Sequence, residues 1–362
     1  MNCDIREIDK ENIRERLDHD LKVIVDEILL SLPQDPDTIL LCGGYGRDEG
    51  AWFYDTNGNI QPYNDYDLSI ITDNSISYNE LQHLKKKLAN ILGIQWIDID
   101  FYPSNYFDNM KPTIKNIDLL YASKLLYGQK HKWPSMQADR IGIYDVVLLY
   151  QTRMWTFLGS WNGNFHDLDL SESRFFNNQM AKAVLAACDM HLIQHRAYTP
   201  LYSDRVEWIC EHLSQKKDLC ELSKWALQEK LYPGDELVKR DVMESRYFVV
   251  KNLFLNAFWE AMAFRANFFL WPQLSKLYFS LTSLYLPRVV YNHIIRKSNK
   301  IEKTMDIFIA QNYVFLANSK AGVKDVYLKK ASQILKKWGY ICEAESDWDI
   351  LRILVSQARN NI

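Results

Sequence analysis

Apolar and polar positions alternate in two short stretches of the first third of the chain. Residues 64–71 read Asn-Asp-Tyr-Asp-Leu-Ser-Ile-Ile, and residues 94–103 read Ile-Gln-Trp-Ile-Asp-Ile-Asp-Phe-Tyr-Pro. Alternation of this kind predicts β-strands. Between them, over 79–92, leucines recur at helical spacing. The pattern therefore predicts a strand–helix–strand unit, which would place the two strands next to each other in one sheet.

Other elements are predicted on the N-terminal side of this unit. An apolar stripe predicts a helix over 4–32, which ends before Pro33. The apolar run Ile39-Leu-Leu-Cys42 predicts a further strand. After a glycine-rich turn, two short apolar runs flank Asn57-Gly58, a dipeptide that favours the tight turn of a β-hairpin. We expect this hairpin to occupy 52–63.

From residue 115 onward the strand pattern nearly vanishes and helical spacing dominates. One helix is expected to end at Gly128, because glycine commonly follows the last helical residue, and a longer helix is expected to be capped by Ser171. The helices predicted in this part of the chain are 118–127, 141–158, 172–196, 204–230, 236–270, 273–297, 302–318, 323–338 and 346–359.

These elements predict an α+β fold. A small mixed sheet with an N-terminal helical segment would occupy 1–112, and a large all-helical domain would occupy 113–362. A length of 362 residues suits two domains with cores of their own. If the helical part forms two sub-bundles, we expect the break near 232–236.

Composition narrows the classes of function. A net charge of −3 argues against broad nucleic-acid binding. The most apolar stretch, 252–287, is interrupted by charged residues and proline, so no membrane span is expected. The six cysteines are scattered without a Cys-x-x-Cys pair, which favours reduced thiols, and no signal peptide is evident. We therefore expect a cytoplasmic protein that does not bind membranes.

The chemistry suggested by the sequence lies between residues 43 and 100. Gly43 and Gly44 would let the backbone approach a phosphate closely. Asp65 and Asp67 occupy alternate positions, so on a strand both carboxylates project from one face. Adjacent carboxylates repel each other, and a divalent cation relieves that repulsion. Asp98 and Asp100 repeat the pattern on the second strand.

This combination resembles the signature of the DNA polymerase β-like nucleotidyltransferase superfamily. The shared features are the glycine turn, the Asp-x-Asp strand and a later third aspartate. Gly-Tyr-Gly-Arg-Asp-Glu-Gly at 44–50 is more similar to the turn of aminoglycoside nucleotidyltransferase-like enzymes than to that of template-directed polymerases. The resemblance covers roughly 38–103. It departs from the family in the long gap between Gly44 and Asp65, which holds the expected hairpin.

The resemblance implies two Mg²⁺ ions, with Mn²⁺ as an alternative, bound by Asp65, Asp67 and Asp100. Asp100 is preferred as the third acid because of its Asp-Phe-Tyr-Pro context, and it would also help to remove the acceptor proton. Asp98 is the alternative ligand, or else a hydrogen-bond partner of the ligands. Gly43 and Gly44 would hold the β- and γ-phosphates through backbone N–H groups.

The position of Arg47 in the glycine turn suggests one further role, and the resemblance implies roles for Lys182 and a tyrosine. Arg47 would reach the same phosphates, or else form an ion pair with Asp48 or Glu49. Lys182 would contact the triphosphate. Tyr198, with Tyr202 as the alternative, would lie near the nucleobase. For Lys182 and the tyrosines an ordinary surface helix and an amphipathic loop are the competing interpretation.

The expected function is template-independent transfer of a nucleoside monophosphate from an NTP, ATP above all, to a small acceptor such as a sugar, an aminoglycoside-like compound or a nucleotide. Pyrophosphate would be released. The alternatives are a catalytically inactive nucleotide-binding or assembly module, a helical interaction protein with acidic surface strands, and nucleotidylation of a protein or tRNA as in toxin–antitoxin systems. The acceptor and the oligomeric state do not follow from the sequence.

Overall fold

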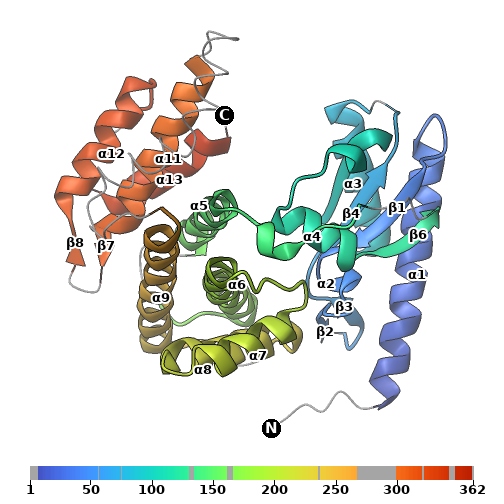
Figure 1. Ribbon diagram of the computed structural model, residues 1–362, viewed down its shortest axis with the longest axis horizontal. Helices are drawn as coiled ribbons and strands as arrows, with labels where there is room; N and C mark the ends of the chain where they lie inside the picture. Colours follow the sequence, from blue (N-terminus) through green and yellow to red (C-terminus); the bar gives the residue numbers. More distant parts are fainter. Residues whose placement is uncertain are drawn as a thin grey trace. The chain divides into compact units, whose positions relative to one another are not determined.

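The computed structural model describes residues 7–55, 57–74, 76–129, 134–160, 166–234, 237–266, 299–319, 322–341 and 347–360. It is a mixed α and β protein in which helices predominate (Figure 1). The chain forms two compact units. The first comprises Met1–Ile141, Arg196–His212 and Leu227–Gly234, and the second comprises Gly142–His195, Leu213–Ala226 and Asp235–Ile362.

The first unit is built on a four-stranded mixed sheet in the order β5-β4-β1-β6. The strands are β1 (Thr38–Cys42), β4 (Tyr66–Ile71), β5 (Ile97–Tyr102) and β6 (Lys124–Gly128). Strand β1 is antiparallel to both β4 and β6, whereas β4 and β5 are parallel. The parallel connection runs through α3 (Tyr78–Leu92). The predicted strand–helix–strand unit, with its two acidic strands adjacent, is therefore confirmed.

Helix α3 has clear local reasons to begin and end where it does. The Ser77 side chain accepts the N–H of Glu80, and the Glu80 carboxylate accepts the N–H of Ser77, which forms a capping box. At the other end Gly93 adopts a left-handed conformation with φ of 67°. Leu84 and Leu88 are buried against the sheet. These signals account for a helix that the leucine spacing predicted closely.

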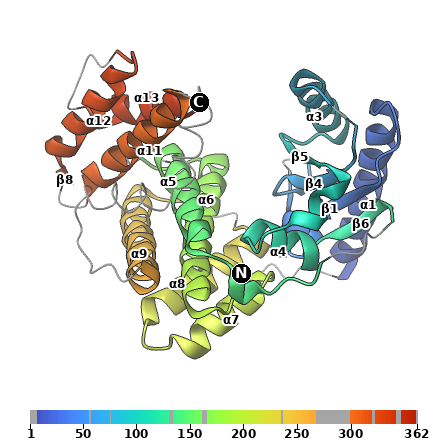
Figure 2. The same cartoon turned by 45° about the horizontal axis from the view of Figure 1, so that its top comes forward.

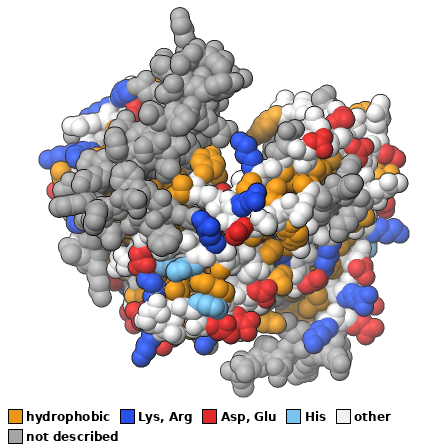
Figure 3. Space-filling view, viewed as in Figure 1, with side chains coloured by type: hydrophobic (Ala, Val, Ile, Leu, Met, Phe, Trp, Pro, Cys, Tyr) orange, Lys and Arg blue, Asp and Glu red, His pale blue; other side chains and the backbone are white. Residues whose placement is uncertain are grey.

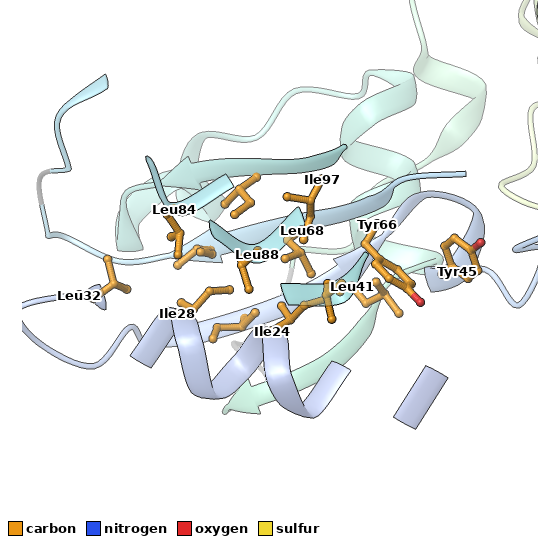
Figure 4. Close-up of a cluster of buried hydrophobic side chains, with 14 residues drawn as sticks. Ile24, Ile28, Leu32, Leu41, Tyr45, Tyr66, Leu68, Leu84, Leu88 and Ile97 are labelled. Atoms are coloured by element: carbon orange, nitrogen blue, oxygen red, sulfur yellow. The ribbon is translucent and has the colours of Figure 1, made fainter. Parts of the chain in front are cut away.

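Helices cover both faces of the sheet. Helix α1 (Glu7–Ser31) and α3 pack on one face, where Ile24 and Ile28 meet Leu68 and other strand residues (Figure 4). On the opposite face α4 (Ile114–Tyr121) contributes Leu119 to a smaller cluster. Because side chains alternate along each strand, the residues between the buried positions of the first face point toward the α4 side. The aspartates are among those residues.

The hairpin expected at 52–63 is also confirmed. Strand β2 (Trp52–Tyr54) pairs antiparallel with β3 (Ile60–Pro62). In the turn one Asp55 carboxylate oxygen accepts the N–H groups of Asn57 and Asn59, each at 2.8 Å. The hairpin separates the glycine-rich turn from β4 in the sequence.

One helix of the first unit ends earlier than expected. Helix α4 stops at Tyr121, and the residues predicted as its second half form β6 instead. Strand β6 pairs with the otherwise open side of β1. Gly128 adopts φ of 83°, and a Cβ there would lie 2.0 Å from the carbonyl oxygen of Asp37. Gly128 therefore ends a strand rather than a helix, and the prediction for 118–127 is wrong in its second half.

The remaining elements are mainly helical. Their bounds are α2 (Gly43–Gly46), α5 (Ile143–Ser160), α6 (Leu170–His195), α7 (Tyr202–His212), α8 (Lys217–Leu231), α9 (Arg240–Ala266), α11 (Asn299–Ala317), α12 (Asp325–Lys337) and α13 (Trp348–Asn360), with 3₁₀ turns at Ser104–Asn109 and Ala138–Arg140 (Figure 2). The short pair β7 (Asn318–Ser319) and β8 (Gly322–Val323) interrupts the part expected to be all-helical. The helix predicted at 273–297 lies outside the described residues.

Two helical predictions in the second half need correction. The helix predicted over 204–230 is divided into α7 and α8, because a turn closed by the Lys216 N–H on the Leu213 carbonyl intervenes. The α6 cap is also different. The carboxylate of Asp169 accepts the N–H of Glu172, and the Glu172 side chain accepts the N–H of Asp169, so Ser171 is not the capping residue.

The core of the second unit is rich in aromatic side chains. Tyr150 stacks on Phe258 with ring centroids 4.0 Å apart. The ring centroid of Phe157 lies 5.7 Å from that of Phe254 and 5.6 Å from that of Phe315. All five rings are fully buried. Burial of large rings provides much of the apolar area that stabilises such a helical unit.

Charge and cysteine usage bear on the expectations about environment. Acidic and basic side chains are interspersed over the described part of the face in Figure 3. None of the helices in the described ranges is long and apolar enough to cross a membrane. Cys42 and Cys188 are not in disulfides, but Cys210 and Cys220 are disulfide-bonded. The expectation of reduced thiols is therefore wrong at these two positions.

Candidate functional site

The glycine-rich turn lies directly against one of the predicted acidic residues. Strand β1 leads into the single helical turn α2, which begins at Gly43 with φ of 63°. A Cβ at Gly43 would lie 1.8 Å from Oδ2 of Asp67. Both the backbone conformation and this contact require glycine. The turn and the Asp67 carboxylate therefore form one continuous surface.

The strand that carries the acids is held by the tyrosine between them. Tyr66 is fully buried, and its hydroxyl donates to Oδ2 of Asp20 at 2.9 Å. The centroid of its ring lies 4.8 Å from the ring centroid of Tyr45, a residue of the glycine turn. With Tyr66 directed into the core, alternation places Asp65 and Asp67 on the other side of β4. The core thus orients both carboxylates.

Three carboxylates meet beside the glycine turn. One oxygen each from Asp65, Asp67 and Asp98 lies within 4.8 Å of the other two. The parallel register of β4 and β5 pairs Asp67 with Asp98 and so brings the second strand's acid to the first. Oδ1 of Asp98 accepts hydrogen bonds from Lys85 and Trp96, at 3.3 and 2.9 Å. Those contacts hold the carboxylate and leave its other oxygen for a cation.

The electrostatics of this cluster favour a bound cation. Burial, followed by the negative charges of Asp65 and Asp98, raises the pKa of Asp67 to about 7. The positive charges of Lys230 and Arg47 oppose that rise. Around neutral pH the metal-free site therefore holds part of a proton in place of a full negative charge. A divalent cation can displace that proton and relieve the repulsion.

Asp100, the residue preferred as the third ligand from its sequence context, lies outside the three-acid cluster. Asp100 lies opposite Ser69 in the register of β4 and β5, two residues beyond Asp98 along β5. Its carboxylate is largely exposed and accepts a hydrogen bond from Lys115 at 2.9 Å. In this structure Asp98 is the acid of β5 that joins Asp65 and Asp67, and the role of Asp100 as a metal ligand stays a prediction. Both acids project from the same face of β5, as expected.

A hollow of about 200 Å³ opens beside the cluster. Its lining includes Gly43, Arg47, Asp67, Asp98 and Asp100. The hollow thus combines the glycine turn, the acids and a guanidinium group in one place. It is smaller than a complete site for a typical small-molecule ligand, so it would hold part of such a ligand.

Cys42 also lines this hollow but is not suited to nucleophilic chemistry. Burial raises the pKa of its thiol to about 12, and the thiol contacts Oγ of Ser69 at 3.4 Å. A thiol with so high a pKa supplies almost no thiolate at neutral pH. The acids that line this hollow are therefore better candidates for its chemistry than Cys42.

Arg47 forms one of the ion pairs that the sequence suggested, and a further one. Its Nε donates to Glu49 at 3.3 Å, and Nη1 donates to Asp118 at 3.2 Å. Its side chain is only 6% exposed. Asp48 instead pairs with Lys124. Arg47 thus has an ion-pairing role while also lining the hollow, so the two interpretations offered by the sequence do not exclude each other.

Tyr198 belongs to the first unit but is not open to a nucleobase. It is 5% exposed, and its hydroxyl donates to Oδ1 of Asp118 at 2.8 Å. The guanidinium of Arg205 lies 4.5 Å from its ring centre. Its predicted role in stacking on a base therefore conflicts with its burial. Tyr202 is half-buried, with Arg47 and Arg205 at 4.6 and 4.8 Å from its ring centre.

A lysine other than the predicted one lies near the acids. Lys182 is on α6 in the second unit. Lys230, in the first unit, is 5% exposed and donates to Oδ1 of Asn64 at 2.7 Å. Asn64 immediately precedes Asp65 in the sequence, and the charge of Lys230 lowers the pKa of Asp67. No local sequence signal distinguishes Lys230 from the surface lysines of a helix.

The second unit has a larger cavity of about 530 Å³, lined in part by His191, Lys216 and Glu260. Three of its titratable groups interact with one another. Lys216 donates to both Glu260 oxygens, at 2.9 and 2.7 Å, and burial lowers the pKa of His191. Glu260 thus has a basic partner at Lys216, whereas Asp65, Asp67 and Asp98 crowd negative charge beside the glycine turn. Size alone does not make it the better candidate for chemistry.

Comparisons with known proteins do not assign a family. No protein-family model matches the chain, and no curated protein or solved structure matches it. Any function must therefore be inferred from the side chains and their geometry.

Proposed function

We propose that the protein is a nucleotidyltransferase that depends on a divalent cation. It transfers a nucleoside monophosphate from an NTP to the hydroxyl group of a small acceptor and releases pyrophosphate, without a template. The observation that carries this proposal is the meeting of Asp65, Asp67 and Asp98 beside the turn at Gly43. The remaining features of the site agree with an anionic, metal-bound ligand.

The donor set fits Mg²⁺, and Mn²⁺ is an acceptable substitute. All three side chains offer carboxylate oxygens, the ligands that hard divalent cations prefer. The raised pKa of Asp67 reflects burial and crowded negative charge, which a cation would offset. When bound, the metal would neutralise charge on the triphosphate as the leaving group departs.

The chain's own residues can bind the phosphates next to that metal. The glycine turn lies against the Asp67 carboxylate, and Gly43 lines the same hollow, so a phosphate held there would lie beside the backbone of the turn. Arg47 lines the same hollow and supplies a delocalised positive charge suited to phosphate oxygens. Lys230, bound to Asn64, supplies a second positive charge near the acids. Lys230 would thus offset part of the negative charge of the acids, and the phosphate role suggested for Lys182 stays a prediction.

The group-transfer step has a consistent balance. The acceptor hydroxyl oxygen forms a bond to the α-phosphorus, and the bond from that phosphorus to the bridging oxygen of the β-phosphate breaks. Pyrophosphate leaves with the bonding electrons, and the hydroxyl proton passes to a base. Asp100 is our candidate for that base, because it lines the hollow but lies outside the three-acid cluster. Lys115 orients its carboxylate.

Thermal stability with each of the four NTPs, measured with and without Mg²⁺, tests the binding part of the proposal. We expect a Mg²⁺-dependent rise in melting temperature that is lost in Asp65→Asn plus Asp67→Asn. Asp139→Asn is the matched control, because Asp139 is an exposed acid of the same unit outside the cluster. Binding without any dependence on Mg²⁺ would favour an inactive nucleotide-binding module, and absence of binding would reject the proposal.

Release of pyrophosphate from the best-bound NTP tests catalysis. The wild type would be incubated with Mg²⁺ and a small-metabolite extract, and products carrying an added nucleotide would be identified by mass spectrometry. Asp139→Asn should form the same products as the wild type, and the double variant should form none. Turnover retained in the double variant would refute the assignment of these acids.

A further inference from the structure

Glu49 connects the glycine turn to a helix that lies far along the sequence. Its Oε2 accepts the N–H of Tyr202 at 3.0 Å, and its Oε1 accepts the N–H of Ser203 at 3.1 Å. These N–H groups belong to the first turn of α7, where intrahelical partners are lacking. Glu49 is only 7% exposed. The carboxylate thus caps α7 from within the glycine-rich segment.

The same carboxylate also holds Arg47. Oε2 of Glu49 accepts from Nε, while Asp118 accepts from Nη1 on another edge of the guanidinium. The Tyr202 ring contacts the guanidinium from a third direction, 4.6 Å from its centre. An arginine bound in this way has lost most of its rotamer freedom before any ligand arrives.

The groups that hold Arg47 are themselves fixed. Asp118 accepts hydrogen bonds from the Tyr198 hydroxyl and from Nη2 of Arg205. Arg205 is 2% exposed, and it also donates to the carbonyl oxygens of Thr199 and Pro200, at 2.6 and 2.7 Å. Glu49 and Asp118 therefore form one ion-pair network with Arg47 and Arg205, and Arg47 and Asp118 also line the hollow.

We propose that Glu49 is a positioning residue that, together with Asp118, holds the Arg47 guanidinium at the hollow beside Asp67. This inference rests on the proposed function, since the group presented by Arg47 would meet the phosphates of the bound NTP. Glu49 does not contact the nucleotide. It acts through Arg47, a residue that lines the hollow together with Asp67.

A double-mutant cycle separates this role from two simpler ones. The dissociation constant of Mg–NTP would be measured for the wild type, Glu49→Gln, Arg47→Met and the double variant, using the NTP that binds the wild type best. Glutamine keeps the size of Glu49 but removes the charge that holds Arg47. We expect Glu49→Gln to weaken binding roughly tenfold, and to have no weakening effect when Arg47 is already methionine.

The two simpler roles give different results. If Glu49 only added negative charge near an anionic ligand, its neutralisation would tighten binding in both backgrounds. If it only capped α7, Glu49→Gln would weaken binding to the same extent in both backgrounds. Either result would overturn the inference. Glu80→Gln is the matched control, because Glu80 also caps a helix of this unit and should leave binding unchanged.

The outcomes also distinguish this inference from the proposed function. A wild type that binds no Mg–NTP would refute the proposed function and the inference together. A wild type that binds Mg–NTP, with an unchanged dissociation constant in Glu49→Gln, would refute only the positioning role. Melting temperatures of all four proteins, measured without nucleotide, would show that the variants remain folded at the assay temperature.

Discussion

Gly43 and Asp67 occupy adjoining space so closely that any side chain at position 43 would overlap the carboxylate. A Cβ there would lie 1.8 Å from Oδ2 of Asp67. The relationship ties the backbone of the glycine turn to the proposed metal site. A change in one is therefore expected to disturb the other.

Gly43→Ala is expected to destabilise the protein and to abolish Mg²⁺-dependent stabilisation. A left-handed conformation costs a non-glycine residue roughly 1–2 kcal/mol, and displacement of Asp67 adds to that cost. Gly93→Ala is the matched control, because Gly93 has φ of 67° and nothing within 4 Å of its Cβ position. Chemical denaturation with and without Mg²⁺ would measure both effects. Equal behaviour of the two variants would contradict the proposed contact.

Asp67→Asn is expected to change how the metal-free protein responds to pH. The pKa of Asp67 rises from 3.8 to about 7 on folding, so the folded state binds more protons between these values. This residue therefore lowers the stability of the wild type progressively as pH rises from about 4 to 7. At about 1.4 kcal/mol per pH unit, the upper limit is roughly 4 kcal/mol.

The measurement is the free energy of unfolding in EDTA at pH 4.5 and pH 8. The difference in unfolding free energy, Asp67→Asn minus wild type, should be more positive at pH 8 than at pH 4.5. Asp139→Asn serves again as the exposed control and should show no such difference. A parallel pH dependence in wild type and Asp67→Asn would contradict the raised pKa.

Asp98→Asn and Asp100→Asn are expected to affect different steps, metal binding and product formation respectively. Asp98 belongs to the three-acid cluster, so its replacement should weaken Mn²⁺ binding at least tenfold, or about 1.4 kcal/mol. Asp100 lies outside that cluster and should retain metal binding while product formation falls. Isothermal titration with Mn²⁺, followed by a pyrophosphate assay, would separate the two roles. Loss of metal binding in Asp100→Asn alone would restore the assignment suggested by the sequence.

Lys251→Met tests a buried charge in the second unit. Lys251 is 3% exposed, and its ammonium donates to the carbonyl oxygens of Phe315 and Asn318. Burial lowers its pKa from 10.5 to about 7, so the folded state binds fewer protons between these values. Stability of the wild type should therefore rise relative to Lys251→Met as pH increases from 7 to 10.

Urea denaturation at pH 7 and pH 10 would measure this relative change. Lys329→Met is the control, because Lys329 is an exposed lysine on α12, and it should not alter the pH dependence. A constant difference between wild type and Lys251→Met would argue that the buried ammonium keeps an ordinary pKa.

Local pattern was sufficient for much of the first unit. Leucine spacing predicted α3, and the Asn57-Gly58 turn predicted the hairpin. Both depend on interactions between residues close in the sequence. The same reasoning failed for β6, since Lys124–Gly128 becomes a strand only through pairing with β1. The spacing of apolar residues within 118–127 predicted a helix and could not reveal that β1 would be a pairing partner.

In the site, too, some features follow from the local sequence and others follow only from the tertiary structure. Alternation correctly put Asp98 and Asp100 on one face of β5, but the choice between them depended on register. Register depends on how two strands separated by α3 slide against each other, which their own composition does not specify. Lys230 and Glu49 acquire their contacts from segments that are distant in the sequence.

The sequence by itself determined the periodicity of the main elements, the conformational freedom of the glycine turn and the presence of acids on two strands. These properties belong to single residues or to neighbours along the chain. Only the tertiary structure decided that Asp98 joins Asp65 and Asp67, that Tyr198 is buried, and that Glu49 caps α7. Those outcomes arise from packing and hydrogen bonding between remote segments, whose free energy exists only once the unit has folded.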